Sequence, residues 1–205
     1  MQYIKRGRQY TFDGFEVTKF NSKAFDAAKK FAENADSKPL ALFGGTATGK
    51  THLLYAVKNI IEQNDPKLTV LLATATEMQI SLVDILHNGG TAEQFREKYM
   101  HADVLLVDDI QELARKKAIQ NELILLFNWF YESGKRFMMT SSKKEANCGM
   151  RSRLVIRSFW GDFAVISKAY IHAQFPSDHE RTEIRNTLLE NGKYLIDDFE
   201  LDSFK

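Results

Sequence analysis

Gly44-Gly45-Thr46-Ala47-Thr48-Gly49-Lys50-Thr51, residues 44–51, has the pattern G-x-x-x-x-G-K-[ST] that is typical of phosphate-binding P-loops. The glycines let the backbone curl so that successive N–H groups point at an anion. Lys50 would add a positive charge for the β- and γ-phosphates of a nucleotide, and Thr51 would offer a hydroxyl to Mg²⁺. The loop therefore predicts a nucleotide site, with the N-terminus of a following helix directed at the phosphates.

The sequence on both sides of the loop has the character that a P-loop requires. A short apolar run, 39–43, precedes it, as expected of a buried parallel strand. Residues 52–61 follow with apolar side chains at helical spacing, namely Leu53, Leu54, Val57, Ile60 and Ile61. An accidental glycine-rich turn would need neither flank, so the flanks favour nucleotide binding.

Composition limits the classes of protein to which the chain can belong. It has 205 residues, enough for one core, and is 44% hydrophobic and 27% charged, as globular proteins are. The formal net charge of +1 provides no global attraction for nucleic acid, so such binding would need a local patch. Cys148 is the only cysteine, which excludes an internal disulfide and suits a reducing cytoplasm. No apolar run approaches membrane-spanning length, and the N-terminus lacks the apolar segment of a signal peptide.

A second motif follows in Val104-Leu105-Leu106-Val107-Asp108-Asp109-Ile110, an apolar strand that ends in two aspartates. This is a Walker B pattern. Asp108 would orient Mg²⁺, and Asp109 would lie where a base can position the attacking water. An ordinary turn with a helix cap could also place two aspartates after a strand. The P-loop upstream, with a strand–helix unit between the two motifs, favours the functional interpretation.

The rest of the chain alternates strands with helices, which predicts a mainly parallel sheet covered on both faces. Further strands are expected at 68–73 and 136–142. Helices are expected at 23–35 (capped by Asn21 or Ser22), 76–87 (with Ile80, Val83 and Leu86 on one face), 92–100, and 118–131 (with Leu123, Ile124, Leu126, Phe127 and Phe130 facing inward). Beyond Ser142, we expect a short helix at 150–158 that carries Arg151, Arg153 and Arg157, a strand at 164–175, and a helix at 176–190.

These elements lead to one expected domain over 1–205, with an N-terminal arm (1–14), an α/β core (15–175), and a C-terminal helix and tail (176–205). The expected fold class is α/β, a three-layer P-loop NTPase.

Several stretches together resemble the AAA+ ATPase domain of the bacterial replication initiator DnaA family, a branch that includes the smaller Hda-type regulators. They are 10–15 with Lys19 and Asn21, the P-loop continued through 51–54, and the segments 93–99, 104–111 and 128–134. The resemblance covers 10–142 well and the remainder weakly, and helicase loaders are the nearest neighbours of the family. It implies an AAA+ fold that assembles with other AAA+ subunits, with nucleotide at the interface.

The resemblance also implies ATP or ADP with Mg²⁺ as cofactors. Backbone near Val17 and Asn21 would contact the adenine, and Thr51 and Asp108 would hold the metal. Lys50, Asp108 and Asp109 would be catalytic, and Arg153 or Arg157 would act on a neighbour's γ-phosphate as an arginine finger. Exposed basic residues on a helix are the alternative reading of these arginines. The phosphate-binding set is Gly44, Gly45, Thr46, Ala47, Thr48, Gly49, Lys50, Thr51 and His52.

The chain departs from the family pattern at several places. Ser142 stands where initiators have an acidic residue, and the family's helical lid and duplex-DNA-binding domain are expected to be missing. In the single-strand-binding segment Val83 matches, but Ala118 replaces a basic residue for which the cluster Arg115, Lys116 and Lys117 could substitute. ATP hydrolysis is therefore expected to be weak at most.

Three functions remain open at this point. The first is a DnaA-like ATP-binding protein that acts in DNA replication initiation or its regulation by packing against another AAA+ subunit. The second is a helicase-loader-like ATPase that binds single-stranded DNA and a helicase. The third is a nucleotide-independent interaction module, which the intact Lys50, Thr51, Asp108 and Asp109 oppose.

Overall fold

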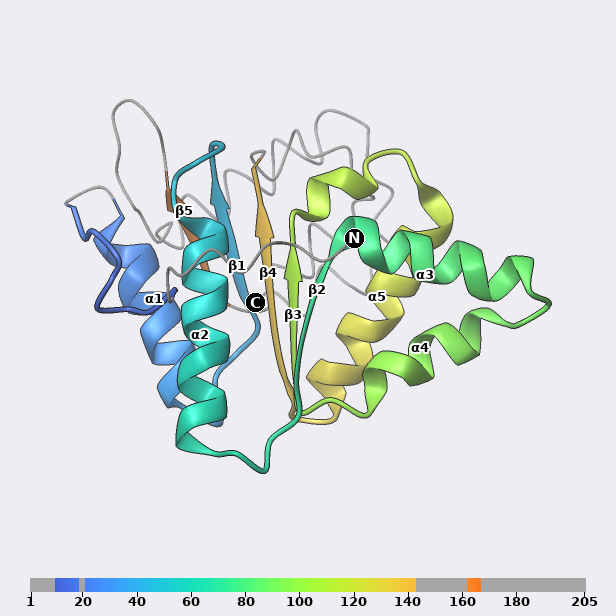
Figure 1. Ribbon diagram of the computed structural model, residues 1–205, viewed down its shortest axis with the longest axis horizontal. Coiled ribbons are helices and arrows are strands. Elements are labelled where there is room, and N and C mark those ends of the chain that lie inside the picture. The colour runs from blue at the N-terminus through green and yellow to red at the C-terminus, as the bar shows by residue number, and fades with distance from the viewer. Residues whose placement is uncertain (1–9, 19–20, 143–161, 167–205) are drawn as a thin grey trace, which may run out of the picture.

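A computed structural model describes residues 10–18, 21–142 and 162–166 of the chain. Within them strands and helices alternate, as the sequence predicts (Figure 1). The strands are β1 (Leu40–Gly44), β2 (Val70–Thr74), β3 (Val104–Asp108), β4 (Arg136–Ser141) and β5 (Asp162–Ile166). The helices are α1 (Ser22–Glu33), α2 (Lys50–Asn64), α3 (Ala75–His87), α4 (Ala92–Met100), the short 3-10 helix η1 (Ile110–Leu113) and α5 (Lys117–Glu132).

The five strands form one sheet in the order β2-β3-β4-β1-β5, and every neighbouring pair is parallel. Each parallel connection needs a crossover, and the helices α2, α3, α4 and α5 provide the crossovers that lead from β1 through β2 and β3 to β4. The carboxyl ends of β1, β3 and β4 consequently lie at one edge of the sheet (Figure 1). Loops at this edge are where open α/β sheets bind their ligands.

Helices cover both faces of the sheet, which gives the three layers that the sequence predicts. On one face α1 and α2 pack against alternate strand residues such as Leu40 and Leu42. On the other face α3, α4 and α5 pack against the residues between them, such as Ala41 and Phe43. Because successive strand side chains point to opposite faces, the continuous apolar runs of β1 and β3 serve both cores.

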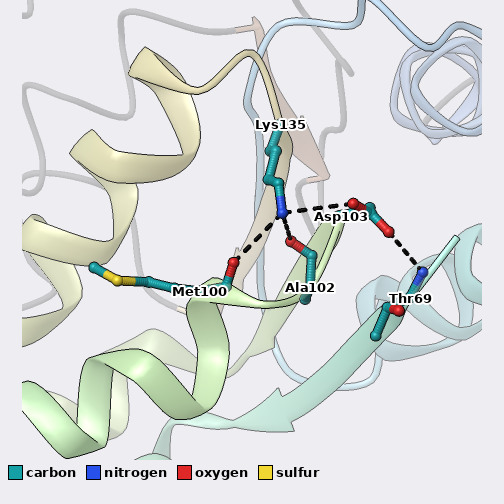
Figure 2. Close-up of polar contacts among 5 residues, drawn as sticks. All are labelled: Thr69, Met100, Ala102, Asp103 and Lys135. Carbon is teal, nitrogen blue, oxygen red and sulfur yellow. Dashed lines mark hydrogen bonds and ion pairs between the residues drawn. The ribbon is translucent and has the colours of Figure 1, made fainter.

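A lysine-centred cluster joins the chain segments at the opposite edge of the sheet (Figure 2). The Lys135 ammonium donates to the carbonyls of Met100, at 3.4 Å, and Ala102, at 2.8 Å, and lies 3.5 Å from an Asp103 carboxylate oxygen. The other Asp103 oxygen accepts from the backbone N–H of Thr69 at 2.9 Å. These contacts hold the starts of β2, β3 and β4 together, far from the edge where the P-loop lies.

Most predicted elements are confirmed, with ends that differ by a few residues. The helix after the P-loop already begins at Lys50 and continues to Asn64. The last predicted strand begins at Asp162, two residues early, and only its course to Ile166 is described. The predicted helices at 150–158 and 176–190 lie outside the described residues. No helix in the described ranges combines the length and apolar character needed to cross a bilayer.

The sequence predicts an apolar face on each of α5 and α3, and only the α5 face is buried. All five apolar residues named on the α5 face are buried, which confirms that prediction. Ile80, Val83 and Leu86 do share a face of α3, but this face is exposed, by 54%, 54% and 47%. The helix instead buries Ala75, Met78 and Leu82, because the sheet, α4 and η1 lie on that side of it. Periodicity identified an apolar stripe but could not tell that it faces away from the core.

Candidate nucleotide-binding site

The P-loop joins β1 to α2 at the carboxyl edge of the sheet, and its backbone curls back on itself. Ala47 and Gly49 have positive φ angles of 60° and 92°. The Thr48 hydroxyl and the Lys50 ammonium both donate to the Gly45 carbonyl, at 2.8 and 2.9 Å. The Lys50 side chain is only 5% exposed, so the ammonium is held within the curve of the loop. This curl is the backbone conformation that gathers N–H groups around an anion.

The N-terminus of α2 adds positive potential to the same place. Gly49 occupies its N-cap position without a side-chain cap, and no acidic residue lies in the first turn. The positive end of the helix dipole is therefore not offset by an acidic side chain from the helix's own first turn. Such an end is a ready anion site.

The Walker B aspartate lies directly against the P-loop helix. Asp108, the last residue of β3, is 4% exposed. Its Oδ2 accepts a 2.8 Å hydrogen bond from the hydroxyl of Thr51, which is 57 positions away in the sequence, and its Oδ1 accepts from the hydroxyl of Thr140 on β4. The structure thus brings together the two residues predicted to hold a metal. Each carboxylate oxygen has one fixed donor, which sets the orientation of the group.

The donor set of this site fits Mg²⁺ bound together with a nucleotide. The described residues contain no group of three or more His, Cys, Asp or Glu that could hold a metal by themselves. P-loop sites do not need one, since Mg²⁺ there takes a hydroxyl, a carboxylate, phosphate oxygens and waters. The Thr51 oxygen keeps lone pairs while its proton is donated to Asp108. Thr51 and Asp108 would hold the ion, and the ion would neutralise phosphate charge.

The second aspartate has an unusual backbone that its neighbours hold in place. Asp109 adopts the left-handed conformation, with φ 57° and ψ 50°, which aspartate tolerates better than most residues. Its N–H donates to the Thr140 hydroxyl at 3.0 Å, and its Oδ1 accepts from the Gln111 amide at 2.9 Å. The side-chain oxygen of Gln111, Oε1, accepts from the Ser142 N–H at 2.8 Å. These contacts join the Walker B turn to the end of β4.

The N-terminal segment crosses α2 beside the P-loop. The His52 Nε2–H donates to the Thr11 carbonyl at 2.8 Å. The rings of Tyr10 and Phe15 lie edge-on to the His52 imidazole, with centroids 5.2 Å away in each case. Phe15 also approaches Gly49 so closely that a Cβ there would lie 2.6 Å from its ring. The His52 side chain is thus engaged by this segment, and any phosphate contact of His52 would come from its backbone.

The two residues predicted near the adenine lie in one turn. Asn21 occupies the N-cap position of α1, but its side chain does not cap the helix, contrary to the expectation. Instead its Oδ1 accepts from the Thr18 N–H at 2.7 Å, and its Nδ2 donates to the Glu16 carbonyl at 2.9 Å. The amide therefore fixes the backbone on both sides of Val17, whose side chain is 48% exposed.

Burial raises the pKa of the nearby Tyr55 phenol above its ordinary value of 10.0, and the carboxylates of Asp108 and Glu77 raise it further. Tyr55 lies one turn beyond Thr51 on α2. A tyrosine is neutral near pH 7 even at its ordinary pKa, so the phenol adds no negative charge to a site meant for phosphates, and the shift widens this margin.

The residues predicted to contact single-stranded DNA are also brought near one another. Arg115, Lys116 and Lys117 are exposed in the basic connection from η1 to α5, which ends at Lys117, the first residue of that helix. The Lys116 ammonium donates to the Gln79 side chain on α3 at 2.6 Å, one helical turn from the exposed Val83. The basic connection thus lies against the apolar α3 face. Arg153 and Arg157, the predicted arginine fingers, lie outside the described residues.

Sequence reasoning gave no role to two residues of the site. Thr140 is fully buried and bridges both aspartates. Gln111 belongs to the Walker B stretch, and its contact with Ser142 depends on a strand, β4, that begins 25 residues later. A polar residue at the end of an apolar strand was the only available signal for Thr140.

A family model described as "Bacterial DnaA ATPAse domain" matches residues 7–164 of the chain. The replication initiator DnaA of Thermotoga maritima is 36% identical over 184 residues, which cover 88% of this chain and 40% of that protein. DnaA of Geotalea uraniireducens is 33% identical over 191 residues, 92% of this chain and 42% of that protein. The chain thus spans about two fifths of the curated relatives it matches.

Solved structures agree with the sequence matches. Domain III of the Thermotoga maritima DnaA protein superimposes with a TM-score of 0.75 at 33% identity, over 94% of this chain and 78% of that one. A DnaA bound to AMPPCP and single-stranded DNA gives 0.73 at 28% identity, over 98% and 60%. The DnaC helicase loader gives 0.66 at 17% identity, over 80% and 99%, which shows a shared fold alone. With a family match over most of its length, the three-layer sheet and the P-loop against the Walker B strand, this chain belongs to the bacterial DnaA ATPase domain family.

Proposed function

We propose that the chain binds ATP with Mg²⁺ and acts in DNA replication initiation or its regulation, by nucleotide-dependent packing against another AAA+ subunit in the cytoplasm. The partner would be a second copy or a DnaA-type initiator. The observation that carries the proposal is the 2.8 Å hydrogen bond between Thr51 and Asp108, beside the buried Lys50. A relative described as bound to AMPPCP supports adenine nucleotide as the ligand.

Each residue has a defined part in the proposed site. Lys50 and the P-loop backbone would bind the phosphates, and Thr51 and Asp108 would hold Mg²⁺. The turn around Val17 and Asn21 would contact the adenine. Slow hydrolysis in the assembled state belongs to the same proposal, with Asp109 orienting the attacking water. Arg153 or Arg157 would then reach a neighbouring subunit's γ-phosphate.

Nucleotide affinity and assembly test the proposal in one set of samples. ATP and ADP affinities are measured with Mg²⁺ for the wild type, for Lys50→Ala, and for a control, Lys58→Ala. Lys58 lies on the same helix but pairs with Glu62, away from the loop. We expect Lys50→Ala to lose binding and Lys58→Ala to keep it, with a mass in solution that rises with ATP more than with ADP.

The outcomes of this experiment separate the possible functions. Binding without a rise in mass would mean that the subunit needs a foreign partner, such as a DnaA-type initiator added to the sample. An absence of binding in the wild type would overturn the proposal and leave the nucleotide-independent interaction module.

A second candidate function is single-stranded DNA binding on the α3 side. The observation that favours it is the basic connection held against the apolar α3 face through Lys116 and Gln79. Aliphatic side chains such as Val83 could contact bases, while Arg115 and Lys117 contact phosphates. A helicase partner, as proposed for a helicase-loader-like ATPase, would belong to this second candidate function.

Salt dependence tests the DNA proposal. Fluorescence anisotropy with a labelled single-stranded oligonucleotide should show an affinity that falls with salt by a logarithmic slope of about −0.7 for each neutralised phosphate. Lys117→Ala should reduce this slope, whereas Lys29→Ala, an exposed lysine on α1, should leave it unchanged. Equal effects of the two substitutions would argue against a local DNA site.

A further inference from the structure

Gln111 is a nearly buried amide at the candidate site, with a 7% exposed side chain. It lies in η1, the short helix that follows the Walker B aspartates. Its Nε2 donates to Asp109 Oδ1 at 2.9 Å, and its Oε1 accepts from the Ser142 N–H at 2.8 Å. One side chain therefore contacts both the second aspartate and the residue just after β4.

The chemistry of the two partners allows only one orientation of this amide. A carboxylate can only accept, so the NH₂ group must face Asp109, and a backbone N–H can only donate, so the oxygen must face Ser142. Burial makes both hydrogen bonds matter, since an unpaired amide there would lose its contacts with water. Neither an ionised glutamate nor an apolar residue of the same length could satisfy both partners.

We propose that Gln111 is a positioning residue for ATP hydrolysis, which holds the Asp109 carboxylate in place and ties it to the end of β4. The inference rests on the proposed nucleotide function, in which Asp109 orients the attacking water. The Asp109 backbone is already fixed by its N–H bond to Thr140 at 3.0 Å. Gln111 fixes the direction of the Asp109 side chain as well and couples it to Ser142.

Two variants of Gln111 separate its two hydrogen bonds. Gln111→Glu keeps an acceptor for Ser142 but places a second carboxylate against Asp109. Gln111→Met has a similar length and removes both bonds. Gln120→Met is the matched control, because Gln120 is also a buried amide, donating to the Leu113 carbonyl at 2.6 Å, and lies in α5. All variants are made in the full chain and their thermal unfolding is recorded.

The measurements are steady-state ATP hydrolysis, ATP affinity, and hydrogen exchange of the Ser142 amide by NMR. For both Gln111 variants we expect kcat to fall about 10- to 100-fold, with KM and ATP affinity changed by less than about threefold, since the phosphate contacts are untouched. Ser142 exchange should accelerate in Gln111→Met and stay near wild type in Gln111→Glu. Gln120→Met should lose stability but keep its kcat.

Three results would overturn the inference. The first is a kcat in both Gln111 variants within about twofold of that of Gln120→Met, which would make Gln111 only a structural residue. The second is unchanged Ser142 exchange in Gln111→Met, which would remove the tie to β4. The third is a wild type that binds ATP without turnover, which would end the hydrolytic role while leaving nucleotide binding intact. A wild type that binds no ATP would instead refute the proposed function itself, and the affinity measurement would show this directly.

Discussion

Replacement of Gly49 by alanine tests the contact between the N-terminal segment and the P-loop. Gly49 has a φ of 92°, a region that residues with a Cβ rarely adopt. A Cβ at this position would lie 2.6 Å from Cε2 and 3.0 Å from Cζ of Phe15. The substitution thus combines backbone strain with a steric clash against an aromatic ring.

The magnitude follows from these two effects. The left-handed conformation costs an alanine about 1–2 kcal/mol, and an overpacked contact of this kind about 1–3 kcal/mol more. We therefore expect Gly49→Ala to lower the free energy of unfolding by about 2–5 kcal/mol. Gly134 is the matched control, because its φ is 65° but a Cβ there would meet nothing within 4 Å. Gly134→Ala should cost only the strain, about 1–2 kcal/mol.

Urea unfolding of the two variants measures the difference, with an unchanged m-value showing that the same transition is compared. Gly49→Ala should cost less free energy of unfolding in a Phe15→Leu background than in the wild type, because the smaller side chain at position 15 relieves the clash. The reasoning would be refuted if Gly49→Ala cost no more than Gly134→Ala, or if the change at Phe15 brought no recovery.

Two more predictions concern buried polar groups. Thr140→Val keeps the shape but removes the hydroxyl that donates to Asp108 and accepts from the Asp109 N–H, so it should lower the free energy of unfolding by about 2–4 kcal/mol. Thr140→Ser keeps the hydroxyl and should cost about 1 kcal/mol. Urea titration measures both losses, and equal losses would contradict the bridging role of Thr140. Burial raises the pKa of Tyr99 above its ordinary 10.0, so the folded state holds this proton more tightly than the unfolded state does. The resulting stability is fully present below pH 10.0, the unfolded pKa, and is lost as pH rises through the folded pKa. Tyr99→Phe should therefore flatten the fall of unfolding free energy at alkaline pH, measured by urea titration, and an unchanged slope would count against the prediction.

Local sequence patterns were sufficient for the fold class and for the two motifs of the site. The glycines and Lys50 of the P-loop, and the aspartates after an apolar strand, act through their own backbone and immediate neighbours, so their spacing carries the information. Alternating strands and helices likewise predicted a covered parallel sheet, because a strand buried on both faces must be apolar throughout.

Tertiary packing decided which of these pieces touch. The hydrogen bond from Thr51 to Asp108 and the bridge from Gln111 to Ser142 arise because the sheet places β3 beside β4 and β4 beside β1, an order that no local pattern specifies. The same holds for α3, where periodicity cannot distinguish an apolar face that packs from one that remains exposed. A hydrogen bond requires its atoms to lie about 3 Å apart, and in a folded chain that distance is set by the packing of whole elements rather than by spacing along the sequence.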